Sequence, residues 1–315
     1  MRIDPLEPPL PTGAVRPLAR QVLSGPTMGT RYAALFFAPA ECDLVAVERE
    51  LQGVVDMVDV QMSTWKPESD LMRLNRAPVG DWVEVPELLL AVLEAAAEIG
   101  RLSGGAFDIG VGDVVSAWGF GSGRGARDAA RMAQAEARPR QPAHLGLELD
   151  IGGCRVRKLT ELTLDLSGIA KGFGVDELAR VLVTHGISHF LVSIDGELRA
   201  VGGKPDGAPW RVAVEAPRPG QRQAEGVIEL LTGAVATSGD YRHFVDIGGV
   251  RHAHTIDPRR GAPLTGGAAA VTVRAETCMA ADAWATALLV LGPERGVQIA
   301  AAQGIEAMFM GADGR

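Results

Sequence analysis

Apolar and polar positions change their period within the stretch 162–182, which reads LTLDLSGIAKGFGVDELARVL. Leucines at 162, 164 and 166 alternate with polar residues, the pattern of a strand with one buried face. From Val175 onward the apolar residues recur at intervals of three and four, the pattern of an amphipathic helix. Glycines between the two periods permit a tight turn. The stretch therefore predicts a strand, a glycine turn and a helix.

The predicted glycine turn has the chemistry of an anion site. A helix N-terminus presents backbone N–H groups and the positive end of the helix dipole, and Lys171 adds a cation. These features together favour a phosphate, although an ordinary strand-to-helix connection explains the same pattern equally well. The spacing G-x-x-x-x-G-K-[ST] is missing, so a nucleotide-binding P-loop is excluded.

Periodicity predicts further elements on both sides of this stretch. Helical spacing is present in 43–63, 86–103, 276–292 and 293–303. Strand patterns are present in 30–37, 190–201, 210–214 and 305–310. Asp195-Gly196 marks a hairpin turn in the second of these strand regions. Residues 122–144 lack the chemistry of their neighbours and are interpreted as a surface excursion.

Composition and charge exclude several kinds of partner. The 315 residues carry a net charge of −8, which argues against a nucleic acid or an anionic membrane surface, because both call for clustered Lys and Arg. The three cysteines are far apart, so neither a disulfide framework nor a zinc site is predicted. No apolar run is long enough to predict an integral membrane segment.

The first residues of the chain predict a tail. Five prolines fall within the first seventeen residues, and this density disfavours both a helix and a central strand. A flexible Pro-rich tail is therefore expected over 1–20, followed by one folded domain over 21–315. The tail lacks the apolar run of a secretory signal, so a cytoplasmic location is expected.

Three isolated side chains are candidates for binding or catalysis, and each has a structural alternative. Trp65 lies in a polar loop, where it can cover a ligand or anchor the edge of a core. Asp108 lies in a glycine-rich run, where it can face a ligand or cap a turn. His254 stands near Asp257 in a glycine-flanked loop, as a catalyst or as a solvated surface residue.

Asp282 and Thr286 are four residues apart in an apolar helix pattern and therefore share a face. Such a pair either caps locally or supplies hard oxygen ligands to Mg²⁺. Burying a carboxylate without a partner is costly, so Asp282 is expected to be paired or bound to a metal.

Seven short motifs, in order along the chain, resemble those of the ApbE family. They are MGT at 28–30, STW at 63–65, GGAFD at 104–108, LSGIAKGFGVD at 166–176, SGDY at 238–241, HTIDP at 254–258 and ADAWAT at 281–286. ApbE proteins are FAD:protein FMN transferases, which use FAD and Mg²⁺, attach FMN to a Ser or Thr of an acceptor flavoprotein and release AMP. The resemblance implies an α+β fold, with one domain of mixed or antiparallel sheets flanked by helices in an ApbE-like (T-fold-like) architecture.

The resemblance also implies roles for individual residues. The Mg²⁺ ligands are the side chains of Asp282 and Thr286 and the backbone carbonyl of Ala170. The residues in contact with FAD are Met28, Trp65, Ala106, Phe107, Asp108, Ser167, Lys171 and Phe173, with His254 and Ile256 beside it. In catalysis His254 is the expected base for the acceptor hydroxyl, Asp257 orients it, and Lys171 assists the attack on the FAD pyrophosphate.

Two positions depart from the family pattern. The usual G-G-D is Asp195-Gly196-Glu197 here, and Arg260 replaces the Thr that commonly follows the HxxDP motif. The signal and lipid-anchor cysteine of exported members are not seen, which points to a cytoplasmic acceptor or to an export signal missing from this reading frame. Two alternatives use the same residues: an FAD pyrophosphatase that yields free FMN and AMP, and a non-catalytic FAD-binding protein. The Asp282 and Thr286 pair argues against the second, because storage needs no metal.

Overall fold

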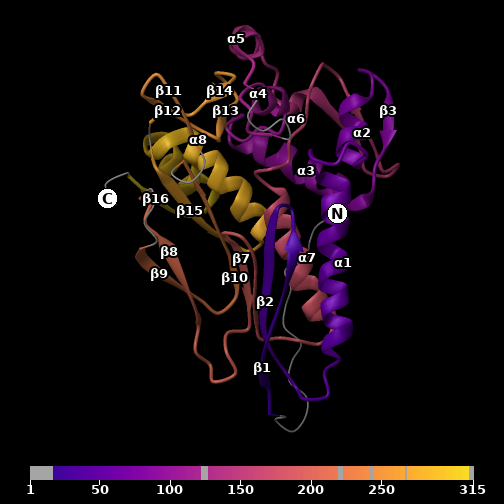
Figure 1. Ribbon diagram of the computed structural model, residues 1–315, viewed down its shortest axis with the longest axis vertical. Coiled ribbons are helices and arrows are strands. Elements are labelled where there is room, and N and C mark those ends of the chain that lie inside the picture. The colour runs from indigo at the N-terminus through magenta and orange to yellow at the C-terminus, as the bar shows by residue number, and fades with distance from the viewer. Residues whose placement is uncertain (1–16, 122–126, 219–222, 241–243, 267, 312–315) are drawn as a thin grey trace.

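A seven-stranded sheet organises the computed structural model, which describes residues 17–121, 127–218, 223–240, 244–266 and 268–311 (Figure 1). Its strands are β1 (Ala19–Thr27), β2 (Thr30–Ala38), β6 (Phe190–Ile194), β7 (Glu197–Val201), β10 (Gly233–Gly239), β15 (Ala270–Ala275) and β16 (Glu306–Met310). They are ordered β1-β2-β6-β7-β10-β15-β16, and every neighbouring pair is antiparallel. This arrangement confirms the predicted α+β fold class with antiparallel sheets.

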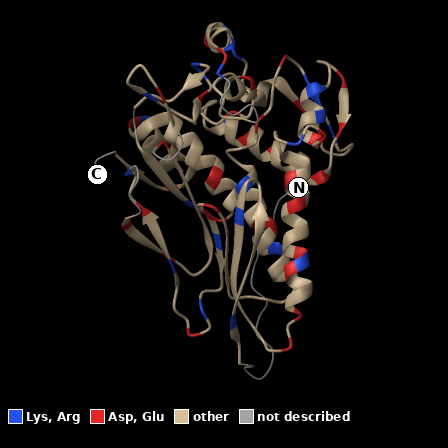
Figure 2. Ribbon diagram, viewed as in Figure 1, with Lys and Arg blue, Asp and Glu red and all other residues tan. Residues whose placement is uncertain are grey.

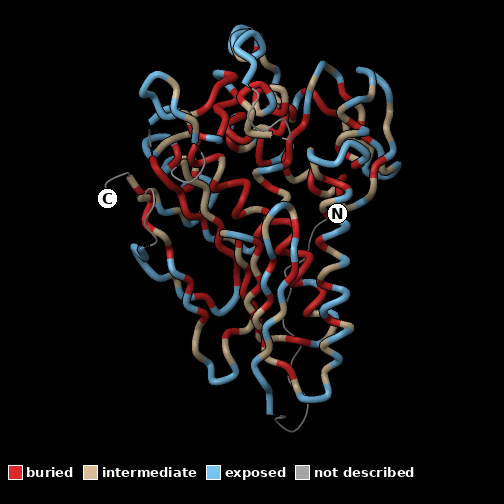
Figure 3. The backbone as a smooth tube through the Cα atoms, viewed as in Figure 1, coloured by how far each residue is buried: buried red, intermediate tan, exposed pale blue. Residues whose placement is uncertain are grey.

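Helices pack on one face of the main sheet. The helices of the described residues are α1 (Leu44–Met62), α2 (Asp70–Arg76), α3 (Glu87–Leu102), α4 (Gly112–Ala117), α5 (Ala129–Ala137), α6 (Ala143–Gly146), α7 (Ala170–Thr184) and α8 (Cys278–Gln303). Buried residues alternate along β2, where Tyr32, Ala34 and Phe36 share a core with α1 and α7. The most continuous burial follows the sheet and the helices against it (Figure 3). This packing places the first turns of α7 and α8 near the start of β7 and the end of β10.

Four smaller sheets surround this centre. Their strands are β3 (Trp82–Glu84), β4 (Leu147–Asp150) and β5 (Arg155–Lys158) in one sheet, β8 (Trp210–Glu215) with β9 (Ala224–Leu230), β11 (Phe244–Ile247) with β12 (Val250–Ala253), and β13 (Ile256–Asp257) with β14 (Ala262–Pro263). The β8–β9 hairpin packs on the opposite face of the main sheet, because Trp210 and Val212 share an apolar cluster with Val235 and Leu191. Lys and Arg are interspersed with Asp and Glu over the fold (Figure 2).

Most elements predicted from periodicity are confirmed. The patterns at 43–63 and 86–103 form α1 and α3, and the hairpin predicted in 190–201 is β6–β7. The two predicted C-terminal helices form α8, which is interrupted at Gly292, where φ is 72° and ψ is 172°, immediately before Pro293. The strand predicted in 30–37 is β2, whereas its hairpin partner β1 was missed. Part of the predicted surface excursion, 122–126, lies outside the described residues.

The predicted strand at 162–166 is wrong, because this segment pairs with no strand among the described residues. The alternation holds only in part: Leu164 and Leu166 are buried and Thr163 is exposed, but Asp165 is buried as well. The backbone is bonded to a loop instead: the N–H of Gly112 donates to the Thr163 carbonyl, and the N–H of Asp165 donates to the Ile109 carbonyl, each at 2.8 Å. Alternation therefore reported burial correctly at Thr163, Leu164 and Leu166 but not at Asp165, and it could not identify the hydrogen-bonding partner.

The helix after the glycines begins at Ala170, five residues earlier than the apolar spacing indicated. The amides of Ala170 and Phe173 donate to carbonyls of the preceding turn, and that of Gly172 donates to a side chain of α8. The expected row of free N–H groups aimed at a phosphate is therefore wrong at these three positions.

The described N-terminal residues do not test the predicted boundary between the tail over 1–20 and the domain over 21–315. Residues 1–16 lie outside the described residues and β1 begins at Ala19, so the boundary at residue 20 stays a prediction. Over the part of the chain that the structure describes, no helix is both long and apolar enough to cross a membrane. The cysteines Cys42, Cys154 and Cys278 are all free thiols.

Candidate active site

One cavity of about 920 Å³ lies where β7 begins and β10 ends. Its wall comes from segments far apart in sequence, including the β1–β2 turn, the first turn of α7 and the first half of α8. The predicted site residues that line it are Met28, Trp65, Ala106, Phe107, Asp108, Ser167, Lys171, His254, Ile256, Asp282 and Thr286. The motifs of the sequence therefore converge on one place.

Three predicted site residues do not line this cavity. The Phe173 side chain is fully buried in the core, so its predicted contact with FAD stays a prediction. The Asp257 carboxylate accepts hydrogen bonds from the backbone N–H and the Nε of Arg259, each at 3.0 Å, so its orientation of His254 stays a prediction. Ala170 packs against the core at the start of α7, and the role of its carbonyl also stays a prediction.

Three carboxylates and one ammonium group meet in the cavity. Lys171 Nζ lies 2.8 Å from Glu197 Oε2 and 3.9 Å from Asp195 Oδ2. Asp282 of α8 lies in the same cavity wall as Lys171 of α7. When all four groups are ionised, the cluster has a surplus of two negative charges. It therefore attracts a further cation.

Burial and this surplus shift the pKa values of the cluster. Burial, and then the charge of Asp282, raises the pKa of Glu197 to about 7. Burial raises the pKa of Asp282 as well, against the opposing influence of Lys171 and of the Gly172 N–H. Burial lowers the pKa of Lys171, but the carboxylates of Glu197 and Asp282 outweigh it and hold that pKa above its usual value. Lys171 is thus a firmly charged cation.

Asp282 and Thr286 offer hard oxygen atoms on successive turns of α8. Asp282 Oδ2 accepts the N–H of Gly172 at 2.9 Å, and the hydroxyl of Thr286 lies 3.0 Å from that of Ser238. This approach needs a glycine at 172, because a Cβ there would lie 2.4 Å from the Cys278 carbonyl oxygen. Among the described residues, no cluster of three or more His, Cys, Asp and Glu could hold a metal. The available donors are therefore a carboxylate and hydroxyl groups, which suit Mg²⁺.

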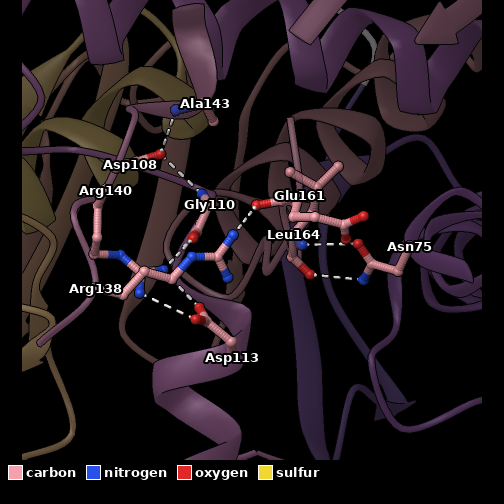
Figure 4. A network of polar contacts seen from close by, with 9 residues as sticks. All are labelled: Asn75, Asp108, Gly110, Asp113, Arg138, Arg140, Ala143, Glu161 and Leu164. Carbon is pink, nitrogen blue, oxygen red and sulfur yellow. Dashed lines mark hydrogen bonds and ion pairs between the residues drawn. The ribbon is translucent and has the colours of Figure 1, made fainter. Parts of the chain in front are cut away.

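The side chain of Asn75 fixes the segment that leads into α7. Its Nδ2 donates to the Leu164 carbonyl at 2.9 Å and its Oδ1 accepts the Leu164 N–H at 2.7 Å, as a neighbouring strand would do (Figure 4). Lys158 Nζ in turn donates to the Asn75 carbonyl at 2.7 Å. Asn75 therefore holds the residues immediately before Asp165 and Ser167, which line or border the cavity.

Asp108 has the capping role that the sequence left open, and its contact with a ligand stays a prediction. Its Oδ1 accepts the N–H groups of Gly110 at 2.8 Å and of Ala143 at 3.0 Å, which caps the loop (Figure 4). Burial raises the pKa of its carboxyl group, against the lowering effect of those two N–H groups. The residue also lines the cavity. Arg140 secures the same loop by donating to the Gly110 carbonyl at 2.8 Å.

Met28 occupies a strained position in the cavity wall. It forms the two-residue β1–β2 turn with Gly29, and the two residues have φ of 45° and 73°. A left-handed backbone costs a residue with a Cβ roughly 1–2 kcal/mol, and hairpin turns of this kind favour Asn-Gly. The Met28 side chain reaches the first part of α7, because a Cβ added at Gly174 would lie 3.2 Å from Met28 Cε. A methionine is thus kept where the turn alone favours asparagine.

Comparison with known proteins agrees with the motifs in the cavity wall. A model of the ApbE family matches residues 28–309. The chain belongs to the ApbE family. It is similar to the FAD:protein FMN transferase of Vibrio cholerae serotype O1, with 39% identity over 95% of this chain and 89% of that protein. It is also similar to the FAD:protein FMN transferase of Escherichia coli K12, with 34% identity over 92% of this chain and 83% of that protein.

Solved structures extend the ApbE likeness to the whole fold. The crystal structure of the Pseudomonas stutzeri flavinyl transferase ApbE in its apo form matches with a TM-score of 0.81 and 35% identity, over 93% of this chain and 91% of that one. The flavin transferase ApbE from Vibrio cholerae matches with a TM-score of 0.83 and 36% identity, over 93% of this chain and 94% of that one.

Several contributors to this ApbE site were missed in the sequence. Glu197 was noted only as a departure from G-G-D, although it forms the ion pair with Lys171. Asn75 carried one overlooked signal, since it is the only asparagine of the chain. Ser238 lies in the SGDY motif and bonds Thr286, whereas Tyr241 of the same motif lies outside the described residues. Sequence spacing alone did not connect these residues with α7 and α8.

Asn75→Asp is expected to weaken FAD binding more than it slows turnover. The carboxylate keeps an acceptor for the Leu164 N–H but presents a second acceptor to the Leu164 carbonyl, which costs about 1–3 kcal/mol. Losing the hydrogen bond to the Leu164 carbonyl is expected to displace the cavity wall near Asp165 and Ser167 while leaving Lys171 and Asp282 in place. The measurement is steady-state kinetics in FAD, with KM raised and kcat changed less. Gln141→Glu makes the same exchange at an exposed site and should alter neither constant; equal effects in the two variants would contradict this role.

Met28→Asn is expected to weaken FAD binding roughly tenfold, about 1.4 kcal/mol, without a matching loss of stability. Asparagine relieves the strained turn, which offsets the packing lost with the methionine side chain. Calorimetric titration with FAD and urea unfolding test the two halves separately. Met57→Asn, the same exchange at an exposed position of α1, should leave FAD affinity unchanged. If Met28→Asn bound FAD with unaltered affinity, Met28 would not be part of the FAD-binding site.

Proposed function

We propose that the chain transfers FMN from FAD to a Ser or Thr hydroxyl of an acceptor flavoprotein in a Mg²⁺-dependent reaction that releases AMP. The observation that carries this proposal is the meeting of Lys171, Asp282 and Thr286 in one cavity with surplus negative charge. The names of the similar ApbE proteins support the same reaction.

The residues present fit Mg²⁺. Asp282 and Thr286 would hold it through their side-chain oxygens, with the Ala170 carbonyl as the third proposed ligand. When bound, the ion would neutralise charge on the pyrophosphate and polarise the phosphorus that is attacked. A divalent cation bound there would also relieve the repulsion between the two buried carboxylates, since the charge of Asp282 raises the pKa of Glu197.

The side chains of the cavity divide the remaining work. Lys171 is held by Glu197 in the cavity wall and binds a phosphate oxygen of FAD, because a fixed ammonium needs no rearrangement to meet an anion. His254 accepts the proton of the acceptor hydroxyl as the new oxygen–phosphorus bond forms to the FMN phosphate. The pyrophosphate oxygen–phosphorus bond breaks on the other side, and AMP leaves with the bonding electrons.

The deciding experiment uses an acceptor flavoprotein purified from cells that lack this chain, so that its Ser/Thr site is unmodified. The chain is incubated with FAD, Mg²⁺ and this acceptor. We expect equimolar AMP and covalent FMN, the first by chromatography and the second by mass spectrometry. An acceptor with the hydroxyl residue replaced by alanine is the control. Release of AMP with free FMN and no covalent flavin would instead establish FAD hydrolysis.

The predicted cytoplasmic location stays a proposal. Cell fractionation tests it, with the full-length chain expected in the cytosolic fraction. Recovery of a processed form outside the cytoplasmic membrane would overturn it.

A further inference from the structure

Strand β8 has one unpaired backbone edge. Among the described residues it pairs only with β9. The N–H of Ala216, just after β8, donates to the Gln223 carbonyl at 2.8 Å. Since antiparallel pairing alternates, the amides of Val212 and Val214 also point to β9, and those of Arg211 and Ala213 point away from it. The irregularity in the pairing adds a residue to β9, so it leaves the alternation along β8 unchanged.

The unpaired edge of β8 faces the candidate active-site cavity. Five consecutive residues, 211–215, line the cavity. Side chains alternate between the two faces of a strand, so a wall made of consecutive residues is formed by the strand's edge. No hydrogen bond to the outward amides of Arg211 or Ala213 is found in the described part of the chain. The cavity thus contains unpaired donors of an extended backbone.

This edge is continuous with the proposed metal site. Val214, near one end of β8, packs against Ala270, which is paired with Gly239 at the end of β10. The neighbouring Ser238 bonds Thr286. A chain lying along β8 therefore ends beside the residues proposed to hold Mg²⁺. The apolar side chains of Leu191, Leu198 and Val235 on the main sheet pack against the β8–β9 hairpin and also line the cavity beside it.

We propose that β8 binds the acceptor flavoprotein by strand addition, with an extended segment around the Ser or Thr pairing to the free edge. This inference rests on the proposed transfer to a protein hydroxyl. Strand addition draws affinity from backbone hydrogen bonds, and alternate side chains of the added strand give specificity. The segment's inward side chains meet Leu191 and Leu198, which favours small or apolar residues there. Its hydroxyl residue lies at the end of β8 nearest Thr286.

Proline substitutions at two directly opposed positions test this inference. Ala213 and Val227 are cross-strand partners in the β8–β9 hairpin, and both amides point outward, one to the cavity and one to the far edge of β9. Proline is tolerated in an edge strand where its missing N–H faces outward. The two variants therefore disturb the hairpin alike, but only Ala213→Pro removes a donor from the cavity.

The probe is a pool of twelve-residue peptides, each with one central Thr and randomised flanks. We expect the wild type and Val227→Pro to attach FMN to the same peptides, and Ala213→Pro to lose at least tenfold in kcat/KM for them with its FAD affinity retained. Equal transfer by Ala213→Pro would overturn strand addition and leave the proposed function standing. A wild type that modifies the flavoprotein acceptor but no peptide would also overturn it, because an extended segment would then be insufficient. If Ala213→Pro also lost affinity for FAD, the free edge of β8 would belong to the flavin-binding site and strand addition would be overturned.

Hydrogen exchange on the wild type provides a test that no folding defect can affect. Addition of a modified peptide should slow exchange at the amides of Arg211 and Ala213 and leave that of Val227 unchanged. Slowed exchange on both edges, or on neither, would contradict binding along β8.

Discussion

Asp282→Ala and Asp282→Asn should each lower AMP release from FAD by about 10²–10³-fold while the fold is retained. Asp282 is buried on α8 with Thr286 one turn on, in a cluster whose surplus negative charge attracts a cation. Asparagine keeps the shape and an oxygen for the Gly172 N–H, but it lacks the charge that holds a divalent ion. The measurement is AMP release across a Mg²⁺ titration.

Thermal melts with and without EDTA separate this role from simple capping. Burial disfavours the charged form of Asp282, and its charge raises the pKa of Glu197, so Asp282→Asn should melt in EDTA at or above the wild-type temperature. Mg²⁺ should raise the melting temperature of the wild type but not that of the variant. Asp195→Asn removes a charge from the same cluster at its exposed edge and should keep the Mg²⁺ response. Near-normal turnover of Asp282→Asn at low Mg²⁺ would refute the ligand assignment.

The sequence predicted the site better than the connections that hold it. The motif residues from Met28 to Thr286 that line the cavity come mostly from turns, loops and the interior of α8, and the order of the motifs along the chain identified them where periodicity did not. Phe173 does not line the cavity, because motif membership does not report which face of a helix a residue occupies. Its side chain points into the core although its neighbour Gly172 contacts Asp282.

Long-range polar contacts were beyond prediction for a physical reason. Asn75 substitutes for a strand beside Leu164, at a separation of 89 residues, so no local pattern joins the two. Likewise Asp176 reads as a polar residue within a helix, and only the packed structure places its carboxylate at the start of α8. Periodicity reports burial, whereas the partner of a buried polar group depends on the tertiary fold.

Asp176 joins three elements by one buried ion pair. It lies in α7 and pairs with Arg199 of β7, and each side chain is 4% exposed. Its two carboxylate oxygens also accept the N–H groups of Cys278 and Met279, at 2.9 Å each, in the first turn of α8. A carboxylate at a helix N-terminus satisfies otherwise unpaired donors and the helix dipole. The residue therefore fixes the helix that presents Asp282.

Asp176→Ala should lower the free energy of unfolding by about 3–5 kcal/mol, because it leaves the Arg199 guanidinium buried without an anion. Arg199→Met should cost less, since the carboxylate retains both N–H donors of α8. The double variant should lose less than the two single losses combined. Urea unfolding measures all three, and Glu306→Ala, which breaks the exposed pair with Arg274, should change stability by less than about 1 kcal/mol. A loss in Asp176→Ala as small as in Glu306→Ala would show that α8 is held by its apolar packing alone.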